Sequence, residues 1–154
     1  MKKWMFFVMA LTTIVMLGAC NIGRGEKSSK SSNYEKGSNT SSLQFLENKK
    51  VGKYLADSKG MALYYFKNDE SEKSNCNGEC LKNWPPFIAE HFKVPVGFDK
   101  NDFGTISRED SGEKQVTYKG YPLYYFVNDK AKGEVNGQGV KGIWFIVNTE
   151  TTFK

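Results

Sequence analysis

The chain has 154 residues and a formal net charge of +5 at pH 7, from 22 lysines and arginines against 17 aspartates and glutamates. This excess lies mainly in residues 1–42, because residues 43–154 carry 16 basic and 15 acidic residues. A nearly neutral domain lacks the basic surface that nucleic acid needs, so we expect no nucleic-acid partner.

The first nineteen residues contain the parts of a signal peptide in their usual order. Two lysines precede an apolar run over 4–18, which is shorter than the roughly 20 residues of a membrane-spanning helix. Residues 17–20 read Leu-Gly-Ala-Cys, which resembles the lipobox of bacterial lipoproteins. The resemblance implies removal of residues 1–19 and lipidation of Cys20, which would anchor the protein in the bilayer on the extracytoplasmic face of the cell membrane. An uncleaved anchor helix is the alternative.

The segment that follows has the composition of a stalk. Residues 20–42 are rich in Ser, Gly, Asn and Lys and contain few side chains able to form a core, which predicts a flexible tether behind Cys20. Residues 43–154 suit a single domain with one core.

Two cysteines remain once Cys20 carries lipid. Exported proteins meet an oxidising compartment, so we expect Cys76 and Cys80 to form a disulfide. The closed loop is short, and its entropic contribution to stability is about 2 kcal/mol.

The pattern of the domain is that of strands and turns. Lys-Gly pairs precede two aromatic strands, Asp110-Ser111-Gly112 has hairpin composition, and Gly133–Gly142 reads as a turn-rich loop. One or two helical turns fit Glu79–Asn83 or Ala89–Lys93, and Trp84-Pro85-Pro86 must be extended. Strands are predicted over 53–57, 63–66, 103–109, 114–118, 123–126 and 143–148. The expectation is an all-β domain with little helix, built as a meander, as two similar sheets or as a partly closed sheet.

The domain contains an internal repeat. Gly60–Asp69 matches Gly120–Asp129 at seven of ten positions without a gap, which predicts a duplication with copies over about 51–88 and 103–148. Beyond it, the alignment places Asn77-Gly78 with Asn136-Gly137, Trp84 with Trp144, and Cys76 and Cys80 with Val135 and Gly139.

Each copy carries a Tyr, an aromatic residue and an Asp at fixed spacing. These are Tyr64, Phe66 and Asp69 in the first copy and Tyr124, Phe126 and Asp129 in the second. In a strand, the Tyr and the Phe share one face, and the Asp that follows can accept backbone N–H bonds from its loop. The motif therefore has a structural interpretation. In the functional alternative, the aromatic rings form a ligand platform and the aspartates orient the ligand.

The same residues resemble a known family. The spacing Tyr-x-aromatic-x-x-Asp, present twice, is similar to the motif of secreted-repeat lipoproteins, and the flanking Cys76, Cys80 and Trp84-Pro85-Pro86 agree with it in order. The resemblance covers residues 50 to 148. It implies an exported protein with two related repeats and supplies no reaction.

A copper site is the alternative use of the cysteines. Cys76 and Cys80 with His91 resemble the two-cysteine, one-histidine sites of certain exported copper chaperones, and thiolates suit Cu(I). The alternating strand and helix pattern of those chaperones is lacking here. A histidine that stands alone is more often a surface residue, so we expect no cofactor.

The sequence thus favours a non-enzymatic module that binds an envelope component or another exported protein through its aromatic strands and loops. We expect no catalytic residue. The alternative is an exported redox or copper-handling accessory that uses Cys76 and Cys80.

Overall fold

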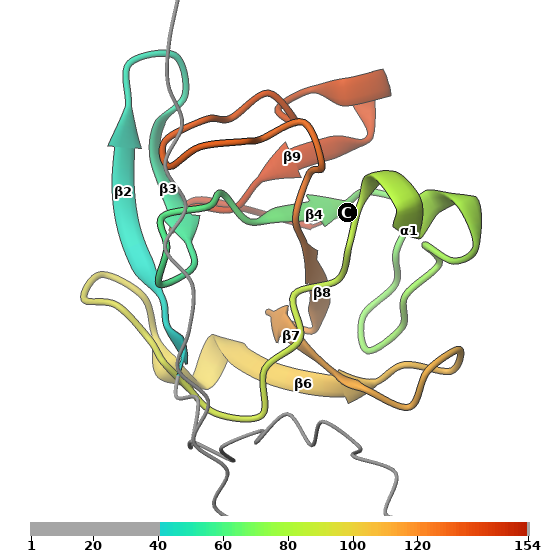
Figure 1. Cartoon of the computed structure of the whole chain (residues 1–154). Helices are drawn as coiled ribbons and strands as arrows, with labels where there is room; N and C mark the ends of the chain where they lie inside the picture. Colours follow the sequence, from blue (N-terminus) through green and yellow to red (C-terminus); the bar gives the residue numbers. More distant parts are fainter. Residues whose placement is uncertain (1–40, 154) are drawn as a thin grey trace, which may run out of the picture. The chain divides into compact units, whose positions relative to one another are not determined.

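The computed structural model describes residues 41–153, which belong to one compact unit and are dominated by β-strands (Figure 1). The predicted signal peptide, the lipidation of Cys20 and nearly all of the stalk fall outside the described residues. Within 41–153 no helix is long and apolar enough to cross a membrane.

Nine strands and one short α-helix make up the described chain, and the predicted all-β class is confirmed. In order they are β1 (Ser41–Ser42), β2 (Gln44–Asn48), β3 (Gly52–Ala56), β4 (Tyr64–Phe66), α1 (Glu79–Asn83), β5 (Phe92–Lys93), the 3-10 turn η1 (Lys100–Asp102), β6 (Phe103–Ser107), β7 (Lys114–Tyr118), β8 (Tyr121–Tyr124), the 3-10 turn η2 (Val140–Gly142) and β9 (Trp144–Ile146). The main sheet is antiparallel with the order β6-β7-β8-β4-β9, β2 and β3 form a hairpin, and β1 pairs with β5 in parallel.

The predicted meander is present. Lys119 and Gly120 connect β7 to β8 with φ angles of 49° and 83°, the left-handed backbone that a tight two-residue hairpin requires. The strand predicted over 103–109 ends earlier, at Ser107, because Arg108 and Gly112 form the turn into β7.

Other predicted bounds were wrong for physical reasons. The second aromatic strand lies over Tyr121–Tyr124 instead of 123–126, because the backbone N–H of Tyr125 donates to Pro85 and the chain there runs along residues 83–87. Ala89–Lys93 is not helical, and Phe92 and Lys93 instead pair with β1. The helix over Glu79–Asn83 agrees with the expectation, whereas β2 was not predicted.

The two repeats are related by a local two-fold arrangement. Strands β4 and β8 pair antiparallel, with Tyr64 opposite Tyr124. On the outer sides, the N–H of Val147 donates to Leu63 O (3.2 Å), and the N–H of Phe87 donates to Leu123 O (2.8 Å). Each repeat therefore sends its last extended segment beside the motif strand of the other repeat, and the two motif strands meet at the centre of the sheet.

Each face of the central strands has its own core. Tyr64 and Tyr124 are buried in one cluster with the tryptophans, and Leu63 and Leu123 are buried in the other. Phe66 packs against the first cluster and Tyr65 against the second, as the alternation along a strand predicts.

Candidate functional site

The two copies of the motif are joined by reciprocal hydrogen bonds. The O–H of Tyr64 donates to Asp129 Oδ2 (2.6 Å), and the O–H of Tyr124 donates to Asp69 Oδ2 (2.7 Å). Both tyrosines are completely buried. We call these four residues the reciprocal clasp, since each tyrosine binds the aspartate of the other repeat.

The second oxygen of each aspartate holds the loop of its own repeat. Asp69 Oδ1 accepts from the backbone N–H of Asn75 (2.6 Å), and Asp129 Oδ1 accepts from that of Asn136 (2.8 Å). Asn75 is therefore the counterpart of Asn136, which corrects the alignment of Asn136 with Asn77. The residue after it is Cys76 in the first repeat and Gly137 in the second, so the alignment of Cys76 with Val135 was also wrong. The error arose because one loop is a residue longer between the aspartate and the clamped asparagine.

The aromatic residues of the motif build a column of stacked rings. Trp84 and Trp144 lie face to face, with centroids 3.8 Å apart and planes 1° apart. Phe66 stacks on the outer face of Trp144, and Phe126 on that of Trp84, each at 4.3 Å. The column runs Phe66, Trp144, Trp84, Phe126, and each phenylalanine packs on a tryptophan from the opposite repeat.

Burial sets the electrostatics of the clasp. It raises the pKa of Asp69 to about 6, against the opposing effect of hydrogen bonds from Asn75 and Tyr124. Burial also raises the pKa of Asp129, and it raises the pKa values of Tyr64 and Tyr124, whose bonds to the carboxylates act in the same direction. The tyrosines therefore stay protonated and act as hydrogen-bond donors.

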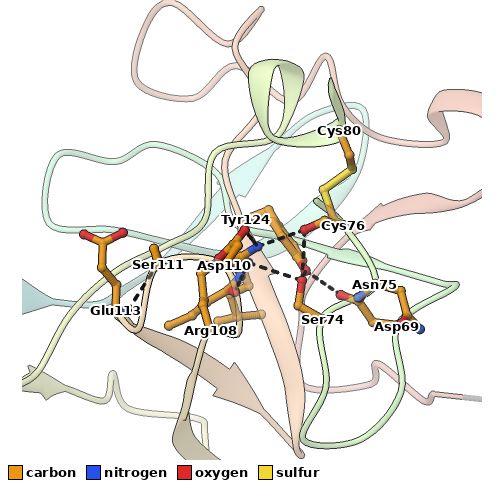
Figure 2. A network of polar contacts seen from close by, with 12 residues as sticks. Asp69, Ser74, Asn75, Cys76, Cys80, Arg108, Asp110, Ser111, Glu113 and Tyr124 are labelled. Atoms are coloured by element: carbon orange, nitrogen blue, oxygen red, sulfur yellow. Dashed lines mark hydrogen bonds and ion pairs between the residues drawn. A yellow bond between two sulfur atoms is a disulfide. The ribbon is translucent and has the colours of Figure 1, made fainter. Parts of the chain in front are cut away.

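A buried arginine extends the clasp on the side of the first repeat (Figure 2). Arg108, which is 5% exposed, donates to Asp110 through Nε (2.8 Å) and Nη2 (2.7 Å) and to Gln115 Oε1 through Nη1 (2.6 Å). It also donates to Ser74 Oγ (3.2 Å) and to the carbonyl oxygen of Cys76 (2.9 Å). Ser74 Oγ lies 2.7 Å from the hydroxyl of Tyr124, so the network reaches the clasp.

Sequence reasoning did not find Arg108 or Gln115. A charged residue directly after a strand has the pattern of an exposed turn, and no spacing in the sequence marks this arginine as buried. The only available signal is Asp110 two residues later, which can pair with an arginine across a tight turn. The hydrogen bonds of Arg108 lower the pKa of Asp110.

A cavity of about 350 Å³ opens beside this network. Its walls come from residues 72–74 and Asn77 of the first loop and from residues 106–110. Arg108 and Asp110 pair with each other, and the other charged residues of the lining are Glu72, Lys73 and Glu109.

A second hollow of about 140 Å³ lies on the face of the sheet opposite the clasp, and its lining is mainly aromatic. Tyr65 faces Phe145 across β4 and β9, and Phe153 from the C-terminal segment stacks on Tyr121 at 4.0 Å. Lys67 and Thr152 complete the lining. We call this the aromatic cleft.

Comparison with protein families agrees with the two-fold construction. A family model described as a secreted repeat of unknown function matches residues 46–87 and 104–148. The chain belongs to this family. Searches of curated proteins and of solved structures gave no significant match.

Each secreted repeat contributes one half of the clasp and of the ring column. The residues that carry the family resemblance are Tyr64, Phe66 and Asp69 with Tyr124, Phe126 and Asp129, and they bind one another across the centre of the sheet. Across residues 41–153 no buried side-chain nitrogen or oxygen lacks a hydrogen-bond partner. The geometry thus gives the motif a structural role in holding the two repeats together.

The cysteines of the first secreted repeat form the predicted disulfide, with Cα atoms 5.4 Å apart. Its sulfurs are therefore not thiolates, the form in which Cu(I) is bound. His91 is exposed, and no group of three His, Cys, Asp or Glu side chains suited to a metal occurs in the described part of the chain. The copper alternative stays a prediction that requires prior reduction of the bridge.

Proposed function

We propose that the protein is an exported lipoprotein, anchored in the cell membrane by acylated Cys20, whose two secreted repeats form a non-enzymatic binding module for an envelope component. Membership of a secreted family supports export. The order of charge, apolar run and cysteine at the start of the chain supports the lipid anchor.

The observation that carries the binding role is the aromatic cleft. Tyr65, Phe145 and Phe153 are only partly buried, whereas the tyrosines of the clasp are inaccessible. Partly exposed aromatic rings offer apolar area at little cost in side-chain entropy, and a lysine beside them can bind an anionic group. The cleft therefore suits an apolar group of an envelope component with a negative charge next to it.

Binding is tested by sedimentation of isolated cell envelopes with the purified, unlipidated Cys20→Ser chain. We expect the chain with an unaltered cleft to bind the envelopes and appear in the pellet. Lys67→Glu or Phe145→Ser should reduce the pelleted fraction several-fold. Lys100→Glu, an exposed change of the same charge away from the cleft, is the matched control. Binding through the cleft would be refuted if all variants sedimented to the same extent, or if no variant sedimented with the envelopes.

The anchor is tested separately in cells. Cys20→Ser should move the protein from the membrane fraction to the medium or to an unprocessed precursor pool. Detergent-dependent membrane retention of a processed mutant would contradict lipidation at Cys20.

The alternative function is an exported redox or copper-handling accessory that uses Cys76 and Cys80. One observation favours its redox form, because Cys76 is completely buried whereas Cys80 is partly exposed. Metal analysis and a visible absorption spectrum of the purified protein distinguish copper handling from the binding module, which should give a blank in both.

A further inference from the structure

Strand β6 forms one edge of the main sheet, and its outer side has unpaired backbone groups. Arg108, directly after β6, donates its N–H to Glu113 O (3.0 Å), and in an antiparallel ladder every second residue counted back from it faces β7. Phe103, Thr105 and Ser107 therefore point their backbone groups outward. Thr105 and Ser107 are exposed, and nothing within residues 41–153 bonds to their N–H or C=O groups.

The two edges of the main sheet differ. At β9 the N–H of Ile146 donates to Gln138 Oε1 (2.8 Å), and the N–H of Gly139 donates to Trp144 O (2.8 Å), so the chain covers this edge itself. In the described part of the chain β6 has no such cover. Its five residues pair with β7 without a bulge and include neither a proline nor a charged side chain, the features that usually protect an exposed edge. This edge can therefore accept another strand.

The edge of β6 is complementary to itself. When two copies of β6 run antiparallel with Thr105 opposite Thr105, all five residues of each strand find a partner. The two threonines exchange both of their backbone hydrogen bonds, and each Ser107 N–H donates to the Phe103 carbonyl of the other copy. The N–H of Phe103 needs no partner, because it donates to Lys100 O within its own chain. Threonines directly opposite each other are a favourable cross-strand pair.

The same register brings opposite charges together at both ends of the strand pair. It places η1 of one copy, which carries the exposed Lys100, beside residues 107–110 of the other copy. Those residues form a wall of the 350 Å³ cavity, whose lining includes Glu72 and Glu109. Among the described residues, neither glutamate has an ion-pair partner, and Lys100 has none either. The two-fold symmetry repeats this charge complementarity at the other end.

We propose that the protein forms a symmetric dimer in which β6 pairs antiparallel with β6 of a second copy and joins the two main sheets into one. A single pair of short strands buries less surface than a stable interface needs, so the dimer is weak in free solution. The proposed anchor at Cys20 would hold both copies on one membrane and raise their effective concentration. The dimer does not depend on the aromatic cleft, which lies at β4 and β9.

Sedimentation velocity of the purified, unlipidated Cys20→Ser chain, at concentrations up to about 1 mM, tests the dimer in solution. We expect reversible dimerisation. Thr105→Pro removes an outward N–H and no bond to β7, so it should give a folded monomer, with folding checked by near-ultraviolet circular dichroism.

Charges at position 105 test the two-fold axis. Thr105→Asp and Thr105→Lys should each weaken the dimer several-fold, because like charges then lie opposite each other, and an equimolar mixture of the two should restore it. Ser58→Asp, an exposed change in the turn after β3, is the matched control and should dimerise normally. The proposal would be overturned by a dimer that Thr105→Asp leaves intact. A monomer at every concentration would also overturn it and would leave the edge to a peptide of another protein.

A cysteine at the two-fold axis tests the same pairing in cells, with Cys20 intact. Opposite residues of a hydrogen-bonded antiparallel pair have Cα atoms about 5.5 Å apart, which is within reach of a disulfide. Thr105→Cys should therefore give a covalent dimer on a non-reducing gel of the membrane fraction, whereas Ser58→Cys, which is also exposed, should remain monomeric. Equal amounts of covalent dimer from the two variants would contradict pairing through β6.

Discussion

Each aspartate of the reciprocal clasp accepts hydrogen bonds from both repeats. Asp69 binds Asn75 of its own loop through one oxygen and Tyr124 of the other repeat through the second. Each of the two carboxylate oxygens needs its own donor, and the loop supplies only one of them. The tyrosine of the other repeat supplies the second donor, which explains why the motif contains both a Tyr and an Asp. The loop and the partner repeat are fixed by the same buried group.

Removing one clasp hydroxyl tests this double role. Tyr64→Phe and Tyr124→Phe should each lower the free energy of unfolding by about 1–3 kcal/mol, because a buried carboxylate oxygen loses its partner. Tyr121→Phe, where the ring is partly exposed and stacked on Phe153, should change it by no more than about 0.5 kcal/mol. Denaturant unfolding of the three variants measures the difference. Equal losses in all three would mean that the clasp hydroxyls do not contribute specifically.

The raised pKa of Asp69 predicts how stability changes with pH. Between the ordinary aspartate pKa and the folded value of about 6, the folded protein binds more protons than the unfolded chain. The contribution of Asp69 to the free energy of unfolding is therefore fully present below its unfolded pKa and is lost as pH rises through about 6. Asp129, whose pKa is also raised, acts in the same direction. Asp69→Asn should reduce this fall in stability, by at most about 1.4 kcal/mol per pH unit. Unfolding at pH values from 4 to 7 measures both slopes, and identical slopes would contradict an elevated pKa.

At the scale of elements, the loop before η2 approaches the clasp closely. A Cβ on Gly137 would lie 2.7 Å from Tyr64 Cζ and 3.0 Å from Trp84 Cη2. The N–H of Gly137 also donates to the hydroxyl of Tyr64 (3.2 Å). A residue without a side chain is needed here to let the second loop reach the tyrosine of the first repeat.

We therefore expect Gly137→Ala to destabilise the fold by about 1–3 kcal/mol through overpacking. Gly112→Ala is the comparison, since its Cβ would meet open space and only its left-handed φ of 72° is unfavourable, which costs about 1 kcal/mol. Thermal or denaturant unfolding ranks the two variants. A smaller loss for Gly137→Ala would mean that the ring of Tyr64 can move aside.

Strands, turns and the duplication were predictable from the sequence, because alternation, Lys-Gly turns and repeated letters are local signals. Strand β7 agrees with the prediction at both ends. The clasp was not predictable, because an aspartate that can cap its own loop gives no indication that a tyrosine 55 residues away also binds it. Arg108 was missed for the same reason, since its burial depends on acceptors that only the folded chain brings together.

At the scale of the whole molecule, each repeat makes its main buried contacts with the other repeat. Trp144 of the second repeat stacks between Phe66 and Trp84 of the first, and each clasp bond crosses between the repeats. Neither repeat can satisfy its buried tyrosine or aspartate alone as a monomer. The duplication is therefore a requirement of the fold, and each repeat is a half that needs a partner.

Cutting the chain between the repeats tests this requirement. Val96 is 96% exposed, so a break between Val96 and Gly97 removes little packing. We expect fragments 41–96 and 97–154 each to lack a folded monomer, because their tyrosines and tryptophans lose their partners, and an equimolar mixture to form one folded complex. Near-ultraviolet circular dichroism reports the ring column, and analytical ultracentrifugation reports the mass of the folded species. Because the repeats share the motif, a fragment can also pair with a second copy of itself. Tyr124→Phe in the second fragment removes a clasp hydroxyl, so it should weaken every complex that contains this fragment. A folded monomer of either fragment would show that a repeat is stable by itself and that the reciprocal clasp is dispensable.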